Sequence, residues 1–164
     1  MINTFFIGDL HIGHTNIIGF CRPEFDSLEE MHEGLIERWN SVVRPKDNVW
    51  HLGDVCFGRH NMHYMSRFNG NIRLTLGNHD HYPMADYLLY FKKVVGVTEY
   101  KRCILTHIPV HPSQFYRFKL NIHGHMHEMK IDDPRYLNVS CEQLNYVPIE
   151  WEEIKEQHKE LFLP

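Results

Sequence analysis

The chain has 164 residues, of which 43% are apolar and 23% are charged, and its formal net charge is −4. This composition is typical of one soluble globular domain spanning residues 1–164, and it excludes a disordered or collagen-like chain. The acidic balance disfavours long nucleic acid as a partner, because a phosphate backbone favours a basic face. No apolar run approaches the roughly 20 residues that cross a bilayer, and the N-terminus lacks a basic signal region, so we expect a cytoplasmic protein with no membrane partner.

Short apolar runs and amphipathic patterns alternate along the first half of the chain, and mostly strands are expected from residue 94 onward. The clearest helix covers residues 27–43, where Ser27 and Glu30 form a capping box and Pro45 follows the end. The sequence therefore predicts an α/β chain with at least one buried sheet. In chain order the expected elements are a strand at 4–7, the helix at 27–43, a strand at 49–52, a helix at 60–68, a strand at 72–76, a helix at 84–91, strands at 103–106 and 120–122, and a helix at 150–161.

Histidine is the compositional outlier, with 14 copies, and imidazole is the commonest transition-metal ligand. Metal-ligand residue types follow the predicted strands, and the strand ends of an α/β sheet gather at one edge. An Asp-x-His or His-x-His spacing puts both side chains on the same side of the chain, so that they can grip one ion. The candidate metal ligands are Asp9, His11, Asp54, Asn78, His107, His125 and His127.

Each ligand candidate also has a plainer interpretation when it is taken alone. His107 could be a hydrogen-bonded histidine, Asp54 a turn or helix cap, and Asn78 part of a turn with Gly77. Taken together these interpretations fail, because every strand end would have to carry a ligand-type residue by accident. A pair of divalent ions about 3.5–4 Å apart needs a ligand set of this kind, with one carboxylate shared.

The chain resembles the calcineurin-like metallophosphoesterases, whose signature blocks it matches in order from residue 9 to residue 127. Residues 6–18 also look like the opening of small uncharacterised members from bacteria and phages. The matching blocks are Asp9-x-His11, Gly53-Asp54, Gly77-Asn78-His79-Asp80, His107 and Gly124-His125-x-His127.

This resemblance implies a two-sheet β sandwich flanked by helices, with four layers in the order α/β/β/α and a dinuclear site at the strand ends. Asp9, His11 and His127 would hold one ion. Asn78, His107 and His125 would hold the other, and Asp54 would bridge the two. His79 would not bind metal; as general acid it would protonate the leaving oxygen.

Such a site can hydrolyse a phosphate ester. A hydroxide held between the ions is a strong nucleophile near neutral pH, and an alkoxide leaves well only if an acid such as His79 protonates it. The mixed nitrogen and oxygen ligands suit Mn, Fe or Zn, and they argue against Mg or Ca alone.

The chain departs from the phosphoprotein phosphatases after the bridging aspartate. Those enzymes have an Asp and an Arg where this chain has Phe57 and Gly58, so a protein phosphatase is disfavoured and the partner that orients His79 is open. Arg59 could replace the missing Arg and bind substrate if the loop differs. His14 could also line the pocket, or it could cap the following segment.

Other histidines and aromatic residues carry weaker expectations. His51 and His123 are expected to be buried structural residues in strands, and the helical histidines 32, 60, 63 and 158 to lie on the surface. Histidines 81 and 111 flank the ligand blocks, and they could either support the ligands or lie in solvent. Aromatic residues in predicted loops could stack a nucleobase, although half or more could be core: Phe57, Tyr82, Phe115, Tyr116 and Phe118.

The favoured function is a dinuclear metal-dependent phosphodiesterase acting on a nucleotide or another small phosphodiester. A phosphomonoesterase is the first alternative, and it would need a cation beyond the metals, for which Arg22, Arg59 and Arg117 are the candidates. A non-catalytic metal-binding scaffold on the same fold is the second. A structural metal site with closed coordination is the third.

Overall fold

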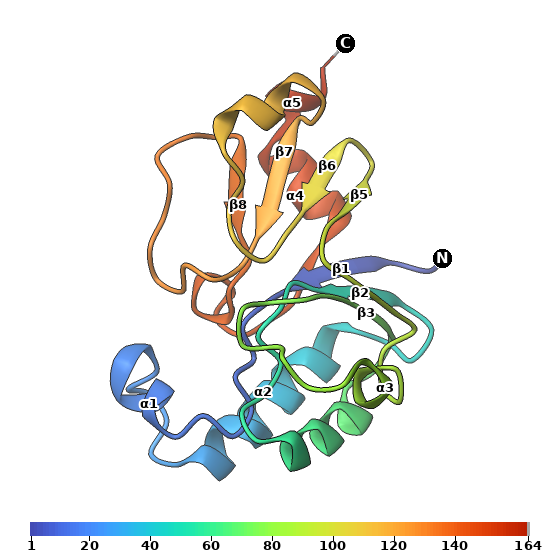
Figure 1. Ribbon diagram of the computed structural model, residues 1–164. Helices are drawn as coiled ribbons and strands as arrows, with labels where there is room; N and C mark the ends of the chain where they lie inside the picture. The colour runs from blue at the N-terminus through green and yellow to red at the C-terminus, as the bar shows by residue number, and fades with distance from the viewer. Residues whose placement is uncertain (164) are drawn as a thin grey trace.

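Two mixed β-sheets, flanked by helices, make up the computed structural model, which describes residues 1–163 (Figure 1). The larger sheet has the order β4-β3-β2-β1-β9, with parallel pairing from β1 to β4 and antiparallel pairing of β9 with β1. The smaller sheet has the order β5-β6-β7-β8, and only β5 runs antiparallel to its neighbour. The strands are Thr4–Ile7 (β1), Asn48–His51 (β2), Asn71–Thr75 (β3), Lys93–Val95 (β4), Thr98–Tyr100 (β5), Cys103–Leu105 (β6), Leu120–His123 (β7), Tyr136–Asn138 (β8) and Ile149–Glu150 (β9).

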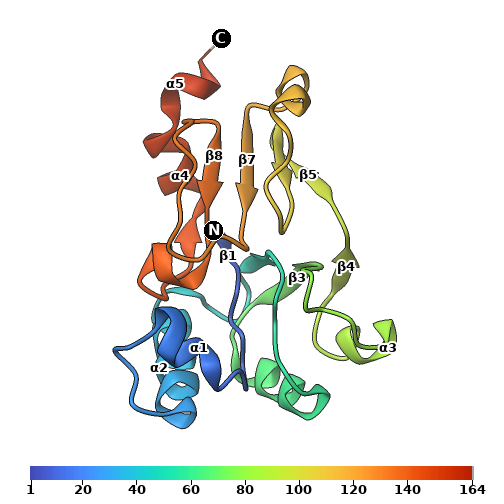
Figure 2. The same cartoon turned by 60° about the vertical axis from the view of Figure 1, so that its left-hand side comes forward.

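The helices fall into two groups in space (Figure 2). The first three α-helices lie on the side of the larger sheet, and the last two lie beside the smaller sheet. Within residues 1–163, no helix combines the length and the apolar character that a bilayer crossing requires. The helices are Asn16–Cys21 (α1), Leu28–Val42 (α2), Met84–Tyr87 (α3), Trp151–Gln157 (α4) and Lys159–Phe162 (α5), with 3₁₀ turns at Arg59–Arg67 (η1), Pro112–Tyr116 (η2) and Cys141–Leu144 (η3).

Strand β1 shows why the predicted strands are continuous apolar runs. Alternate residues of a strand face opposite sides of a sheet, so a strand buried on both sides is apolar throughout. Phe5 and Ile7 pack in one core with α2 and η1, whereas Phe6 packs in a second core with residues of β6, β7 and α4. Both faces of the larger sheet are therefore covered at β1.

Helix α2 confirms the predicted amphipathic helix and its cap. The Ser27 hydroxyl accepts the Glu30 N–H at 3.1 Å, as the capping box requires. The Glu30 carboxylate accepts the N–H of Asp26, one residue before the cap, rather than that of Ser27. The predicted apolar stripe is buried at Met31, Leu35, Ile36 and Trp39.

Several predicted elements differ from those observed. The helix expected at 60–68 is the 3₁₀ turn η1, the one expected at 84–91 shortens to α3, and the last helix breaks at His158 into α4 and α5. The burial of His51 and His123 is confirmed, with 0% and 1% exposure. The prediction of a surface position for His32 is wrong: it is 5% exposed, and its Nε2 accepts the Gly13 N–H at 2.8 Å.

Candidate metal centre

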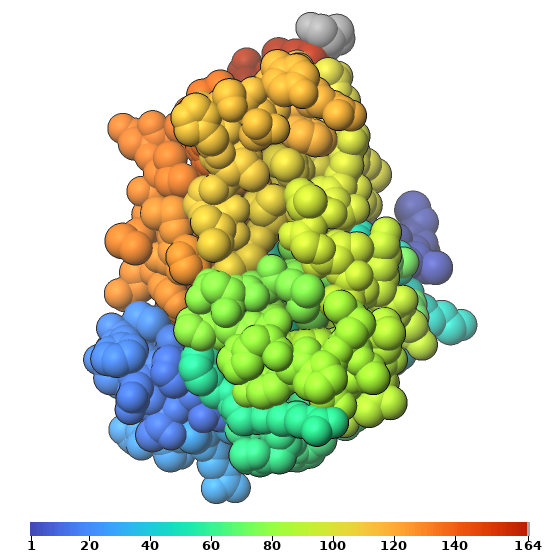
Figure 3. Space-filling view, viewed as in Figure 1, coloured from blue at the N-terminus to red at the C-terminus, as the bar shows by residue number. Residues whose placement is uncertain are grey.

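The polar residues that follow the parallel strands meet at one edge of the two sheets. Strands β1, β2 and β3 run parallel, as do β6 and β7, so their carboxyl ends point the same way within each sheet. Past its end, β1 reaches the second sheet: Gly8 donates its N–H to the Val139 carbonyl and accepts the Cys141 N–H. Figure 3 shows the blue, green and orange segments of the chain meeting on one face. The candidate ligands come from the turns after these strands.

The turns adopt a backbone conformation that L-residues rarely use. Asp9, His11, Asp54, His125 and His127 have φ values of 60°, 50°, 57°, 68° and 47°. A left-handed φ costs non-glycine residues free energy, and Asp and His are among the side chains found there more often than others. Strain of this kind tends to persist at functional sites, where surrounding contacts hold it in place.

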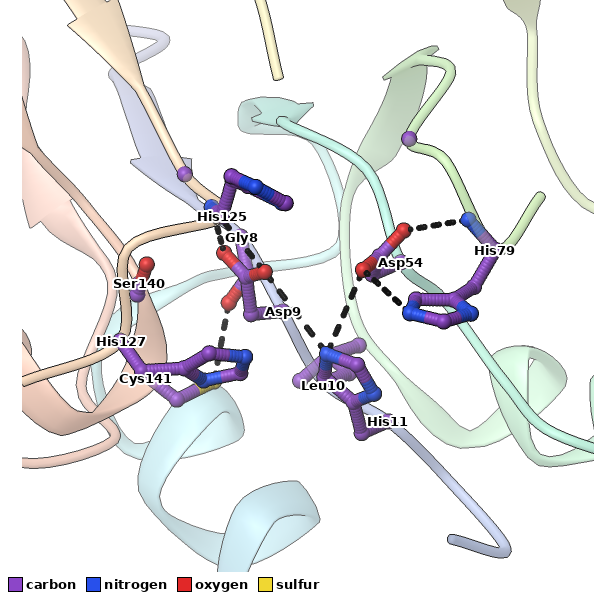
Figure 4. Close-up of polar contacts among 12 residues, drawn as sticks. Gly8, Asp9, Leu10, His11, Asp54, His79, His125, His127, Ser140 and Cys141 are labelled. Atoms are coloured by element: carbon purple, nitrogen blue, oxygen red, sulfur yellow. Dashed lines mark hydrogen bonds and ion pairs between the residues drawn. The ribbon is translucent and has the colours of Figure 1, made fainter. Parts of the chain in front are cut away.

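Asp54 lies between His11 and His79 (Figure 4). Its Oδ2 is 3.4 Å from His11 Nε2 and 3.4 Å from His107 Nε2. His11 Nε2 is also 3.7 Å from Asp9 Oδ1, so its ring lies between the two carboxylates. Two of the groups whose donor atoms lie within 4.8 Å of one another, and which could each hold a metal ion, consist of predicted ligands: Asp9 with His11 and His127, and Asp54 with His107 and His125. Asn78 joins the second group, since its Oδ1 is 2.8 Å from His107 Nε2.

The surroundings of these groups fit metal binding. His11 is 2% exposed, yet neither ring nitrogen has a hydrogen-bond partner, and an unpaired buried polar group is expensive unless something binds it. A Cβ on Gly77 or Gly124 would collide with the carboxylate of Asp54 or Asp9, respectively. The glycines therefore leave space that the carboxylates need, and the carboxylate, imidazole and amide donors suit a divalent transition metal.

The carboxylates of the cluster are held in the ionised form that binds metal. Burial acts to raise the pKa of Asp54, but the hydrogen bond and charge of His107, with the His79 N–H and His11, lower it to about 2. The pKa of Asp9 is also lowered, because His11, His107 and His127 outweigh its burial. Burial acts to lower the pKa of His107, and the neighbouring Asp54 and Asp9 raise it instead.

The orientation of the His107 ring is fixed by a hydrogen bond at its Nδ1 atom. Its Nδ1 lies 2.7 Å from the Leu52 carbonyl, which can only accept a hydrogen bond, so Nδ1 carries the proton. Nε2 is then free to face Asp54 and Asn78 as a ligand atom. This arrangement is the usual way in which a protein fixes the tautomer of a metal-binding histidine.

No family model matches the chain. The uncharacterised protein MJ1445 of Methanocaldococcus jannaschii is 33% identical over 165 residues, which cover 91% of this chain and 87% of MJ1445. The chain belongs to the MJ1445 family.

Two further relatives extend the MJ1445 family comparison. The gene 66 protein of Mycobacterium phage L5 is 42% identical over 85 residues, which cover 49% of this chain and 41% of the phage protein. A crystal structure of AQ665 from Aquifex aeolicus, described as a protein of unknown function, matches with a TM-score of 0.76 and 25% identity. That match covers 95% of this chain and 99% of AQ665, so the two share a fold over nearly their whole length.

His79 lies at the rim of the cluster in this MJ1445-family protein. Its side chain is 42% exposed, its Nε2 is 3.9 Å from Asp54 Oδ2, and its backbone N–H donates to Asp54 Oδ1 at 3.0 Å. The Phe57 ring lies 4.8 Å from the His79 ring, 4.0 Å from the His14 ring and 5.4 Å from the His11 ring. The structure thus places both His14 and His79 beside the cluster and next to Phe57.

The structure does not bring Arg59 to the cluster. The Arg59 guanidinium pairs with Asp86 on α3, with Nε 2.6 Å from Oδ2, and it lines a separate surface pocket with Leu89 and Tyr90. Nor is Arg22 free to bind substrate, because it is 0% exposed and pairs with Glu142. Neither pairing could be predicted from local sequence patterns, because Asp86 lies 27 residues from Arg59 and Glu142 lies 120 residues from Arg22.

Two acidic residues beside the cluster, Asp80 and Glu142, are not predicted from the sequence, and Arg22 is predicted only as a candidate cation for a monoester. Asp80 belongs to the Gly77–Asp80 block, and its carboxylate accepts the N–H groups of Asp54, Val55 and Gly77 at 2.8–3.0 Å. Arg22 and Glu142 pair with each other, and Glu142 Oε1 is 3.1 Å from His127 Nδ1. Burial acts to raise the pKa of Glu142, but His127 and Arg22 lower it to about 2. The block pattern could have flagged Asp80, whereas Arg22 and Glu142 carry no sequence pattern.

Proposed function

We propose that this protein is a dinuclear metal-dependent phosphoesterase with the four-layer calcineurin-like metallophosphoesterase fold, and that it acts on phosphodiesters. One observation carries the proposal. Two groups of ligand-type side chains meet at the Asp54 carboxylate, and their residues are those of the metallophosphoesterase signature. The likeness to AQ665 shows a shared fold over 95% of this chain, and AQ665, a protein of unknown function, lends no activity to the proposal.

The proposed ligand sets follow the two groups. Asp9, His11 and His127 hold one divalent ion, and Asn78, His107 and His125 hold the other. Asp54 is shared by both ions. Two Mn, Fe or Zn ions bound there would lower the pKa of a water and neutralise the phosphoryl oxygens.

His79 is the proposed general acid. It is outside both donor groups, half exposed at the rim, and within 3.9 Å of the shared carboxylate, so its ring can reach the oxygen that leaves a bound phosphate. A proton delivered there converts a poor alkoxide leaving group into an alcohol. Phe57 packs against the ring and Asp54 accepts the His79 N–H, and these contacts hold His79 in place where phosphoprotein phosphatases use an aspartate.

The charges around the site favour a diester over a monoester. A monoester brings an additional negative charge, for which a cation beyond the metals is expected. Arg22 is buried against Glu142 and Arg59 is paired with Asp86, while Arg117 lies over the Phe118 ring. Arg22 and Arg59 are therefore engaged in ion pairs elsewhere.

An aromatic surface beside the cluster favours a nucleotide or another small ester with an aromatic group. Phe57 and His14 stack, and the Phe20 ring lies 6.3 Å from His14 with 72% of its surface exposed. A nucleobase can stack on such rings. The net charge of −4 keeps long nucleic acid disfavoured as a substrate.

Hydrolysis of bis-p-nitrophenyl phosphate and p-nitrophenyl phosphate tests the proposal. Metal-stripped protein supplied with Mn²⁺ should cleave the diester faster than the monoester. His79→Ala should retain both ions, while its turnover of a diester with a poor leaving group, such as an alkyl nucleoside phosphate, falls by about 10²–10⁴-fold. Faster cleavage of the monoester would favour a phosphomonoesterase. Two bound ions without turnover of any ester would favour a metal-binding scaffold.

A further inference from the structure

We propose that Arg22 and Glu142 are positioning residues that join the two metal-binding loops and set the orientation of the His127 ring. The inference rests on the proposed dinuclear centre, and it concerns two residues outside the metallophosphoesterase signature. Neither residue is a proposed metal ligand. Both act through proposed ligands, Arg22 through the backbone of Asp9 and Glu142 through the ring of His127.

Arg22 grips the backbone of the first metal-binding loop. Its Nη1 donates to the Leu10 carbonyl at 2.8 Å, its Nη2 donates to the Asp9 carbonyl, and its Nε donates to Glu142 Oε1 at 2.8 Å. One planar guanidinium therefore holds two consecutive carbonyls and one carboxylate. A lysine has a single charged nitrogen and cannot reproduce this fork.

Glu142 connects that guanidinium to the second loop. Its Oε1 lies 3.1 Å from His127 Nδ1, and its side chain is 5% exposed. When Nδ1–H donates to this carboxylate, the lone pair of Nε2 is left free for an ion held with Asp9 and His11. Glu142 therefore selects the tautomer of His127 that can bind metal in the Asp9 group.

The backbone of His127 is held as firmly as its ring. Gln143 Nε2 donates to the His127 carbonyl at 2.8 Å, and Asn138 Nδ2 donates to the same carbonyl at 3.0 Å. The ring and carbonyl of this ligand are thus fixed by three side chains from β8 and η3. This arrangement counteracts the strain of the left-handed turn at His127, where φ is 47°.

The same residues offer a competing arrangement that the charges disfavour. Cys21, His127 and Glu142 have donor atoms within 4.8 Å of one another and could hold a metal ion of their own. Arg22 lies 2.8 Å from the same Glu142 oxygen, and a second cation beside a guanidinium is repelled. The positive charge of Arg22 already balances the Glu142 carboxylate, as such an ion would.

Titration of the metal-stripped full-length protein with Mn²⁺ tests the inference. Glu142→Gln keeps the size of the side chain and loses its charge, so the affinity for one ion should fall by about 10–100-fold while that for the other is unchanged. Arg22→Lys should weaken binding of the same ion. Glu33→Gln is the matched control, because Glu33 forms an exposed pair with Arg67 at 2.6 Å and should leave both affinities unchanged.

A second readout does not depend on affinity. Side-chain ¹⁵N NMR of the Zn²⁺-loaded protein should show the His127 proton on Nδ1, and Glu142→Gln should shift or broaden that signal. Equal loss of both ions, or no loss of either, would overturn the positioning role while leaving the proposed function intact. A third bound ion that is lost in Cys21→Ser would assign these residues to a separate metal site and overturn it. Failure of the unsubstituted protein to bind two ions would overturn the proposed function itself.

Discussion

Asp54 shows how much of the candidate centre depends on a single side chain. One oxygen lies 3.4 Å from two imidazole nitrogens, and the other accepts the N–H of His79. Its own N–H donates to Asp80, so the backbone of the residue is fixed as well as its carboxylate. At the residue scale, the proposed bridge is therefore the position whose loss should affect both ions.

Asp54→Asn tests the bridge. The amide keeps the shape of the side chain but removes the charge that two cations share, so affinity for both ions should fall by more than the roughly 10–100-fold typical of residues outside the coordination shell. Calorimetric titration of the metal-stripped variant with Mn²⁺ measures both sites. Weakening of one site alone would contradict the bridging role.

At the element scale, the site depends on tight turns between strands and the segments that follow. Gly77 lies two residues after the end of β3, and it passes so close to Asp54 that a side chain there would meet the carboxylate and, at 2.5 Å, the Asp54 backbone nitrogen. Neighbouring backbone is a poor place to relieve a clash, because it cannot rotate away as a side chain does. The turn therefore requires glycine.

Gly77→Ala should destabilise the protein by about 1–3 kcal/mol and weaken metal binding, since the turn must shift away from Asp54. Gly19→Ala is the matched control: it lies in α1 with no atom within 4 Å of an added Cβ, and it should change stability by no more than about 1 kcal/mol in the favourable direction. Urea unfolding of both variants makes the comparison. A Gly77→Ala protein as stable as the parent would show that the turn can adjust.

Local patterns explain which elements could be predicted from the sequence. The strands that lead to the cluster are short apolar runs beside polar residues and glycines, and helix α2 has apolar periodicity, so the positions of these elements follow from short windows of sequence. The extent of η1 and α3 depends on packing against distant segments, which periodicity does not report. The Arg22–Glu142 pair spans 120 residues, and the burial of His32 depends on a hydrogen bond to Gly13, so neither has a local signal.

At the scale of the whole molecule, buried histidines couple stability to pH. His51 is 0% exposed in β2, and neither ring nitrogen has a hydrogen-bond partner. Burial lowers its pKa from 6.5 to about 3, and the nearby Asp9 and Asp54 only partly oppose this shift. Between these two values the unfolded chain binds a proton that the folded chain does not. His51 therefore causes stability to fall as the pH drops from about 6.5 towards 3.

His51→Leu should remove this component of acid sensitivity. The slope for one proton is about 1.4 kcal/mol per pH unit, so the metal-free parent should lose about 2 kcal/mol more than the variant between pH 7 and pH 5. Urea unfolding at the two pH values, with chelator present, measures the difference. Parallel losses in the two proteins would show that His51 takes up no proton on unfolding.

The way in which β1 reaches the second sheet has a consequence for the order of folding. The parallel strands β1 to β3 and helix α2 bring together segments from the first half of the chain, whereas His125 donates its N–H to Asp9 across 116 positions. Closing so long a loop has a large entropic cost until both sheets exist. The ligands should therefore come together only in the last stage of folding, so that ions would slow unfolding without speeding the formation of the early sheet.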